Sequence, residues 1–132
     1  MRRALVVSFL LFIGVGCGDG KSAATPTPPA VTSATGDPRA AIFLNKGCPQ
    51  CHSISALGIK SQAEVGPDLG SAYEDVRTRF GMKLEDFLAA PTGTMQVVLS
   101  SMIKLTPAER DSIIHILKGL HEEREERAEG KH

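Results

Sequence analysis

Two cysteines and a histidine form the most chemically specific cluster in this chain. Residues 48–52 read Cys-Pro-Gln-Cys-His. Two thiols separated by two residues can add to the two vinyl groups of one haem, and the histidine that follows can bind its iron. Cys-x-x-Cys-His is the attachment motif of c-type haem. The spacing therefore predicts that Cys48 and Cys51 hold one haem covalently, and that His52 is an axial ligand of the iron.

Two other uses of a Cys-x-x-Cys pair fit the sequence less well. A redox dithiol of the thioredoxin kind needs a βαβ context, and the flanking residues here are helical in pattern. A tetrahedral zinc site needs two further ligands in a similar cluster. The remaining cysteine and histidines form no such cluster; they are Cys17, His115, His121 and His132.

The composition indicates one small domain with additional segments. The chain has 132 residues, no Trp, one Tyr, and 15 basic against 15 acidic side chains. A balanced charge gives no electrostatic footprint for nucleic acid, so we expect no nucleic-acid partner. A small domain with few aromatic residues has a thin core, to which a covalently held haem would add apolar volume.

The N-terminus has the pattern of an export signal. Arg2 and Arg3 precede an apolar run at 4–15, which is too short to cross a bilayer as a helix but suits a signal peptide. The run ends in Gly-Val-Gly-Cys, which resembles the lipobox of bacterial lipoproteins, although Gly14 stands where Leu is usual. We expect residues 1–16 to be removed and Cys17 to carry a lipid anchor; the alternative is ordinary cleavage that leaves a free thiol.

The segment 17–38 after this signal is rich in Pro, Thr, Ala and Ser and has almost no large apolar side chain. Such a segment cannot bury enough surface to offset its ordering entropy, so we expect a disordered linker. Its role is either a leash between membrane and domain or a remnant of processing.

Three short helices are expected in the first part of the remaining chain. Asp37 and Pro38 suit the start of a helix that Gly47 ends just before the cysteine motif. After a polar loop, a second helix is expected over 71–80 and a third over 84–90, ending before a proline.

A fourth helix has the clearest pattern. Thr106-Pro107-Ala108-Glu109 has the features of a capping box with Pro at the first helical position. Apolar residues at helical spacing follow as far as Leu120, and the charged tail 121–132 is expected to prolong this helix and then fray. No alternating strand pattern occurs, so the sequence predicts an all-α fold.

These features together resemble a class I cytochrome c over residues 39–120. The resemblance rests on a helix leading into Cys-x-x-Cys-His, then Gly-Pro-Asp-Leu at 66–69, a methionine-bearing loop and a C-terminal helix. It implies a small all-α fold packed around one haem, with Phe43 packing the first helix on the last. It also implies that the carbonyl group of Pro67 accepts a hydrogen bond from His52. Arg39 or Ala40 stands where the family often has Gly, and Ile116 where it usually has an aromatic residue.

The family usually supplies a methionine thioether as the sixth iron ligand. Met95 follows a polar loop of the kind that precedes the ligand in relatives, and we expect it to be that ligand. Met102 is the alternative, because its distance from Pro91 is closer to the family spacing, although it lies only four residues before Thr106. Met95 and Met102 also lie on one helical stripe, and a methionine on such a stripe often packs in a core.

The sequence thus predicts an electron carrier and not an enzyme. We expect a membrane-tethered monohaem c-type cytochrome on the periplasmic side of a bacterial membrane, where it passes single electrons between redox partner proteins. One alternative is a haem enzyme or gas sensor with a labile sixth ligand. Another is a fixed cytochrome subunit of a larger respiratory or photosynthetic complex.

Overall fold

The structure is a computed structural model that describes residues 36–130. The expected signal peptide, Cys17 and the linker up to residue 35 lie outside this range, as do the last two residues. The described residues form helices joined by short turns, with no strand and one isolated bridge between Ile54 and Ile59. The α-helices are α1 (Ala40–Lys46), α2 (Ala72–Phe80), α3 (Leu84–Ala89), α4 (Gly93–Val97) and α5 (Pro107–Glu129). The prediction of an all-α domain is confirmed for this part of the chain.

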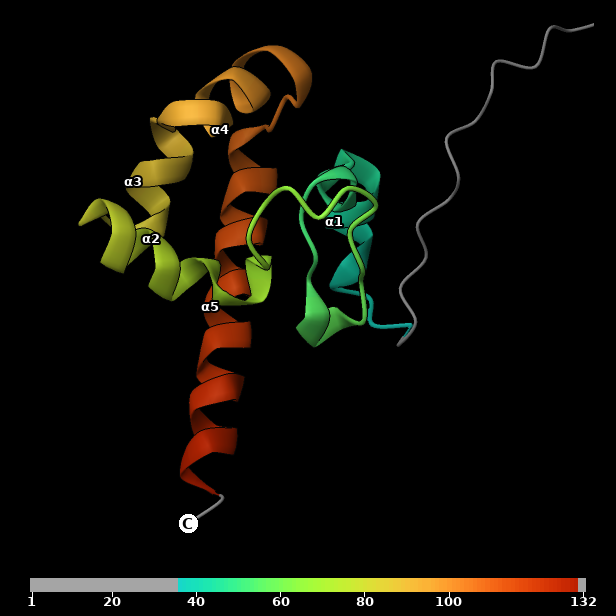
Figure 1. Cartoon of the computed structure of the whole chain (residues 1–132), viewed down its shortest axis with the longest axis vertical. Helices are drawn as coiled ribbons and strands as arrows, with labels where there is room; N and C mark the ends of the chain where they lie inside the picture. The colour runs from blue at the N-terminus through green and yellow to red at the C-terminus, as the bar shows by residue number, and fades with distance from the viewer. Residues whose placement is uncertain (1–35, 131–132) are drawn as a thin grey trace, which may run out of the picture.

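Helix α5 forms the long axis of the molecule (Figure 1). Helix α1 and the segment that follows it lie on one side of α5, and α2 and α3 lie on the other side. The last turns of α5 extend beyond the other helices, because the helix continues through the charged run to Glu129. No helix among residues 36–130 is long and apolar enough to span a membrane.

Local signals set both ends of α1. The carboxylate of Asp37 accepts hydrogen bonds from the backbone and the side chain of Arg39, and this pairing lowers the pKa of Asp37. Regular α-helical structure begins at Ala40, slightly later than the expected start at Asp37 and Pro38. Gly47 ends the helix in the left-handed region, at φ 74°, where glycine carries no steric penalty. Cys48 therefore follows immediately after the last turn of α1.

The start of α5 has the predicted capping box. The side chain of Thr106 accepts a hydrogen bond from the Glu109 amide, and the Glu109 carboxylate accepts one from the Thr106 amide at 2.9 Å. Pro107 occupies the first helical position. These contacts satisfy two amide groups that a helix start otherwise leaves unpaired, and they fix where α5 begins.

The core forms where α1 crosses α5. Phe43 has no solvent-exposed surface, and Leu117 and Leu120 on α5 are almost fully buried in the same cluster. Of Arg39 and Ala40, the two residues expected where cytochromes c often have Gly, Ala40 is buried in this contact and 2% exposed. Ile116 packs against the cluster from its edge. Ala40 thus lies in the buried contact between α1 and α5, and Ile116 lies partly buried at its edge.

The segment before α5 differs from the expectation of a polar loop. Residues Gly93–Val97 form the short helix α4, and Val98–Met102 continue it as a π-helical turn. The stripe of apolar residues at Met95, Val98, Leu99 and Met102 explains the difference, since this spacing favours a helix. Met95 therefore lies within a helix and not in an irregular loop.

Candidate functional site

The cysteine motif folds as one tight turn directly after α1. Residues Cys48–Gln50 form a 3-10 turn with the buried Pro49 near its start. The amide groups of Cys51 and His52 both donate to the carbonyl oxygen of Cys48, at 3.2 and 3.0 Å. Both cysteines are free thiols. The turn thus fixes the backbone of the two thiols and the imidazole relative to one another.

Burial changes the acidity of the first thiol. Desolvation raises the pKa of Cys48 to about 11, although the nearby charge of Lys46 acts in the opposite direction. Cys48 is consequently a neutral thiol at pH 7.

The imidazole of His52 is held from one side by the segment Gly66–Pro67. Its Nδ1 atom lies 2.7 Å from the carbonyl oxygen of Pro67, which is the contact that the cytochrome c resemblance implies. A carbonyl oxygen can only accept, so Nδ1 carries the proton in this hydrogen bond and Nε2 has the free lone pair. The ring packs so closely on Gly66 that a Cβ atom there would lie 2.3 Å from Cε1. Backbone and glycine together form a cradle for this ring.

Backbone hydrogen bonds attach this cradle to the cysteine turn. The Gly66 amide donates to the carbonyl oxygen of Cys51, and the Leu69 amide donates to that of Ser53, both at 2.8 Å. The cradle therefore pairs with the residues on either side of His52 itself. Movement of the cradle relative to the cysteine turn would have to break these hydrogen bonds.

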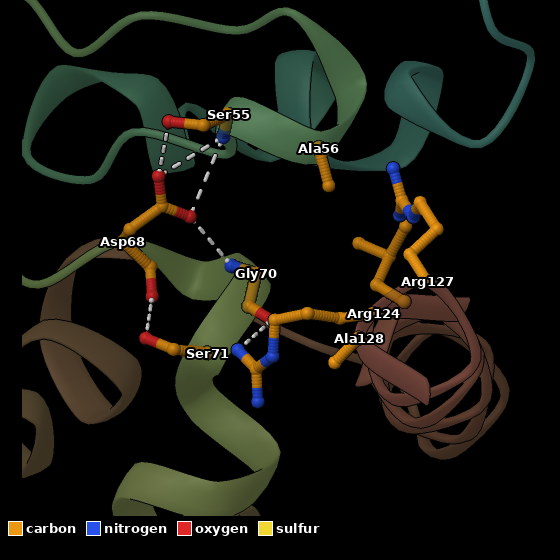
Figure 2. Close-up of a pocket in the computed structure, with 9 residues that line it drawn as sticks. Ser55, Ala56, Asp68, Gly70, Ser71, Arg124, Arg127 and Ala128 are labelled. Carbon is orange, nitrogen blue, oxygen red and sulfur yellow. Dashed lines mark hydrogen bonds between the residues drawn. The ribbon is translucent and has the colours of Figure 1, made fainter. Parts of the chain in front are cut away.

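Asp68 closes the turn after Pro67 (Figure 2). Its carboxylate accepts hydrogen bonds from the backbone and the hydroxyl of Ser55 and from the amide of Gly70, at 2.7 Å for the last. Arg124 on α5 donates to the carbonyl oxygen of Gly70 at 3.4 Å. The segment 66–70 thus contacts His52 through Pro67 and α5 through Gly70. The surface hollow beside it, about 490 Å³, is lined by none of the residues of the cysteine motif.

Two other histidines have different surroundings. His121 stacks on Tyr73, with ring centroids 5.1 Å apart, and pairs with Arg124. His115 is exposed on α5. Within residues 36–130, no three His, Cys, Asp or Glu side chains gather as a metal-binding group.

The two candidate methionines have contrasting environments. Met95 is partly buried and packs against the apolar core from α4. Met102 ends the π-helical turn and is 71% exposed. The next residue, Ile103, is extended, and its amide donates to the carbonyl oxygen of Val98 at 2.8 Å. The side chain of Met102 is therefore largely exposed, while the backbone beside it is held by a hydrogen bond.

Lys46 joins the cysteine turn to the methionine segment. Its Nζ atom donates to the carbonyl oxygen of Lys104 at 3.0 Å and lies 2.7 Å from Oε2 of Glu109. Sequence reasoning did not identify this lysine. A basic residue in the last turn of a helix is common, and nothing local pairs it with residues about sixty positions away.

The residues of this site fit a covalently held haem. They supply two adjacent thiols, an imidazole whose Nε2 lone pair is free, and a glycine cradle that leaves room for that ring. This donor set is the one that c-type attachment requires.

No family model, curated protein or solved structure matches this chain. The resemblance to class I cytochromes c therefore rests on the residues themselves and on the geometry described above.

Proposed function

We propose that this protein is a class I c-type cytochrome that carries single electrons between redox partner proteins. The observation that supports this most directly is the hydrogen bond from His52 to Pro67, formed beside the two thiols of the attachment motif. A haem held there supplies one-electron exchange at its iron. The chain itself performs no bond-making chemistry on a substrate in this proposal.

Each residue of the site has a distinct role in holding the cofactor. The thiols of Cys48 and Cys51 would hold the haem by adding across its two vinyl groups, sulfur to one carbon and hydrogen to the other, an addition that needs no oxidant. Nε2 of His52 would supply the lone pair that binds the iron. The Pro67 carbonyl fixes the ring orientation and raises the basicity of the imidazole, which favours the oxidised iron.

For the sixth ligand we propose Met102, with Met95 as the competing candidate. The sequence favours Met95, but its side chain contributes to the core, and withdrawing it would cost apolar contacts. Met102 is largely exposed and would lose few apolar contacts on binding iron. It lies two residues before Lys104, whose carbonyl group binds Lys46. A thioether ligand favours reduced iron and raises the potential.

Replacing each methionine with alanine separates these candidates. The variant that lacks the ligand should lose the sulfur-to-iron charge-transfer absorption and show a lower midpoint potential. If M95A has this effect and M102A does not, Met95 is the ligand and our assignment is wrong.

Covalent haem is the first test of the whole proposal. The protein should be produced with a cytochrome c maturation system, and its haem should resist extraction by acidified acetone. Replacing both Cys48 and Cys51 with serine should make the haem extractable or abolish its binding. Wild-type protein that matures without covalent haem would refute the proposal.

The membrane tether is a separate part of the proposal and rests on Cys17, outside the described residues. A lipid on Cys17 would place the haem domain on the periplasmic side of a membrane, attached through the linker. Full-length protein should then sediment with membranes, and C17S should be released in soluble form. Equal sedimentation of both proteins would contradict a lipid anchor at this residue.

A haem enzyme or gas sensor is the second candidate function. The exposure of Met102 favours it, because a solvent-exposed thioether is easier to displace than a buried one. Carbon monoxide distinguishes the two functions. A carrier with a firm sixth ligand should bind little carbon monoxide in the reduced native state, whereas a sensor should bind it readily.

A fixed subunit of a larger respiratory or photosynthetic complex is the remaining alternative. Such a subunit would copurify with its partners in mild detergent.

A further inference from the structure

The position of Lys46 carries an inference that rests on the proposed function and extends it. Its side chain bridges two points of the segment that leads from the methionine turn into α5, the carbonyl group of Lys104 and the carboxylate of Glu109. These two points lie on either side of the N-cap Thr106. A single ammonium group thus fastens the whole entry to α5 onto the last turn of α1.

Neither acceptor of this ammonium group is a freely moving side chain, because one is the backbone carbonyl group of Lys104 and the other is a carboxylate held in the capping box. Glu109 is part of the capping box, where its Oε2 atom also accepts the Thr106 amide at 2.9 Å. The contact with Lys46 is the largest cause of the lowered pKa of Glu109, and the hydrogen bond from the Thr106 backbone adds to it. The side chain of Lys46 is 22% exposed, so its contacts are partly shielded from solvent. The bridge therefore joins two prearranged groups rather than two freely moving side chains.

The bridge restrains Met102 from its C-terminal side. The Ile103 amide is bonded to Val98, and the Lys104 carbonyl group is bonded to Lys46, so the backbone on this side of Met102 is held at two successive residues. Lys46 itself lies two residues before Cys48. The methionine segment and the haem-attachment turn are therefore tied together by one side chain.

We propose that Lys46 is a positioning residue for the axial methionine: it restrains the backbone just after Met102 and so would resist opening of the sixth position when haem is bound. Loss of this bridge would leave the proximal ligand His52 in place and make the distal ligand easier to displace. The apparent affinity of a competing ligand rises with the fraction of open protein, so the opening can be measured directly.

Imidazole is the probe for this opening. Ferric haem-loaded protein is titrated with imidazole, and binding is followed by the loss of the sulfur-to-iron absorption. K46M should bind imidazole about five- to tenfold more tightly than wild type, because a charge-assisted hydrogen bond no longer opposes opening. K46R should retain most of the wild-type behaviour, since a guanidinium group can reach the same acceptors.

Two control variants separate this role from general effects. Arg39 forms another ion pair between α1 and α5, with Glu123, far from the methionine segment. R39M should lower global stability without tightening imidazole binding. Lys60 is 85% exposed and lies 3.5 Å from the carboxylate of Glu64 in the same loop, so K60M controls for the lost charge.

The outcomes separate failure of this inference from failure of the proposed function. If wild type carries covalent haem and M102A loses the absorption, but K46M binds imidazole within twofold of wild type, the positioning role is refuted. An equal shift in R39M would refute it too, because the effect would then be global. Absence of covalent haem from wild type would refute the proposed function and this inference with it. If K46M fails to mature, E109Q replaces it; an affinity rise of about two- to threefold is expected, and an unchanged affinity overturns the role.

Discussion

Replacing Gly66 with alanine tests the cradle around His52 with the smallest change that the site allows. The added Cβ atom would lie 2.3 Å from Cε1, 2.4 Å from Nδ1 and 2.9 Å from Nε2 of the imidazole. The backbone of Gly66 does not lie in the left-handed region, so alanine meets no conformational penalty there. The effect of the variant therefore comes from the ring alone.

The size of the effect follows from these distances. An ordinary contact between such atoms is about 3.5 Å, so the ring or the segment must move by about 1 Å. A displacement of that size would lengthen the 2.7 Å contact with Pro67 beyond hydrogen-bonding range. Overpacking costs about 1–3 kcal/mol, and the lost hydrogen bond adds about 0.5–1.5 kcal/mol. We expect the free energy of unfolding to fall by roughly 2–4 kcal/mol.

Thermal unfolding and redox titration of the haem-loaded protein measure both consequences. The stability loss corresponds to a drop in Tm of at least about 8 °C for a domain of this size. The midpoint potential should rise, since a less basic imidazole stabilises oxidised iron less. Gly119 is the matched control, because it lies in α5 with no atom within 4 Å of an added Cβ, so G119A should be neutral or stabilising. If G66A has the same Tm and the same midpoint potential as wild type, the proposed packing of His52 on Gly66 is refuted.

Two further predictions concern α5. The lowered pKa of Glu109 means that its carboxylate stabilises the folded state fully above the ordinary glutamate pKa of 4.5, and that this contribution is lost as the pH falls through the folded-state value. Urea unfolding of E109Q and wild type should therefore differ most at neutral pH and converge in acid; a difference that persists in acid would contradict the assigned cause. Leu117 is 2% exposed in the core, so L117A should lower the free energy of unfolding by about 2–5 kcal/mol, while the exposed neighbour variant K118A should change it by less than about 0.5 kcal/mol. Equal effects of the two variants in chemical denaturation would contradict the packing described for α5.

The sequence predicted those features that depend on neighbouring residues. Gly47 ends α1 and Gly81 ends α2, both with the left-handed backbone that glycine favours. The capping box at Thr106 and Glu109 forms as its spacing indicates. In each of these cases the determining contacts span only a few residues.

The features that sequence reasoning missed depend on contacts between distant segments. The bridge from Lys46 to Lys104 and Glu109 joins residues about sixty positions apart, and no local pattern encodes it. The helical state of Gly93–Val97 was open to prediction from the apolar stripe at Met95, but its polar start at 92–94 favoured a loop. Packing of Met95 on the core outweighs the weak local preference.

The geometry around α1 bears on whether the protein is a carrier or a sensor. The residues from Lys46 to His52 make two kinds of contact with distant segments. His52 lies against Gly66–Pro67, and Lys46 binds the carbonyl group of Lys104, two residues after Met102. A sensor needs its sixth position to open when a ligand arrives, and a clamp on the methionine segment opposes that opening. An electron carrier needs the same two ligands in both oxidation states, so that little rearranges when an electron moves. If Lys46 holds the methionine segment as proposed, the exposed thioether of Met102 is a surface ligand on a fixed backbone, and this combination favours electron carriage over sensing.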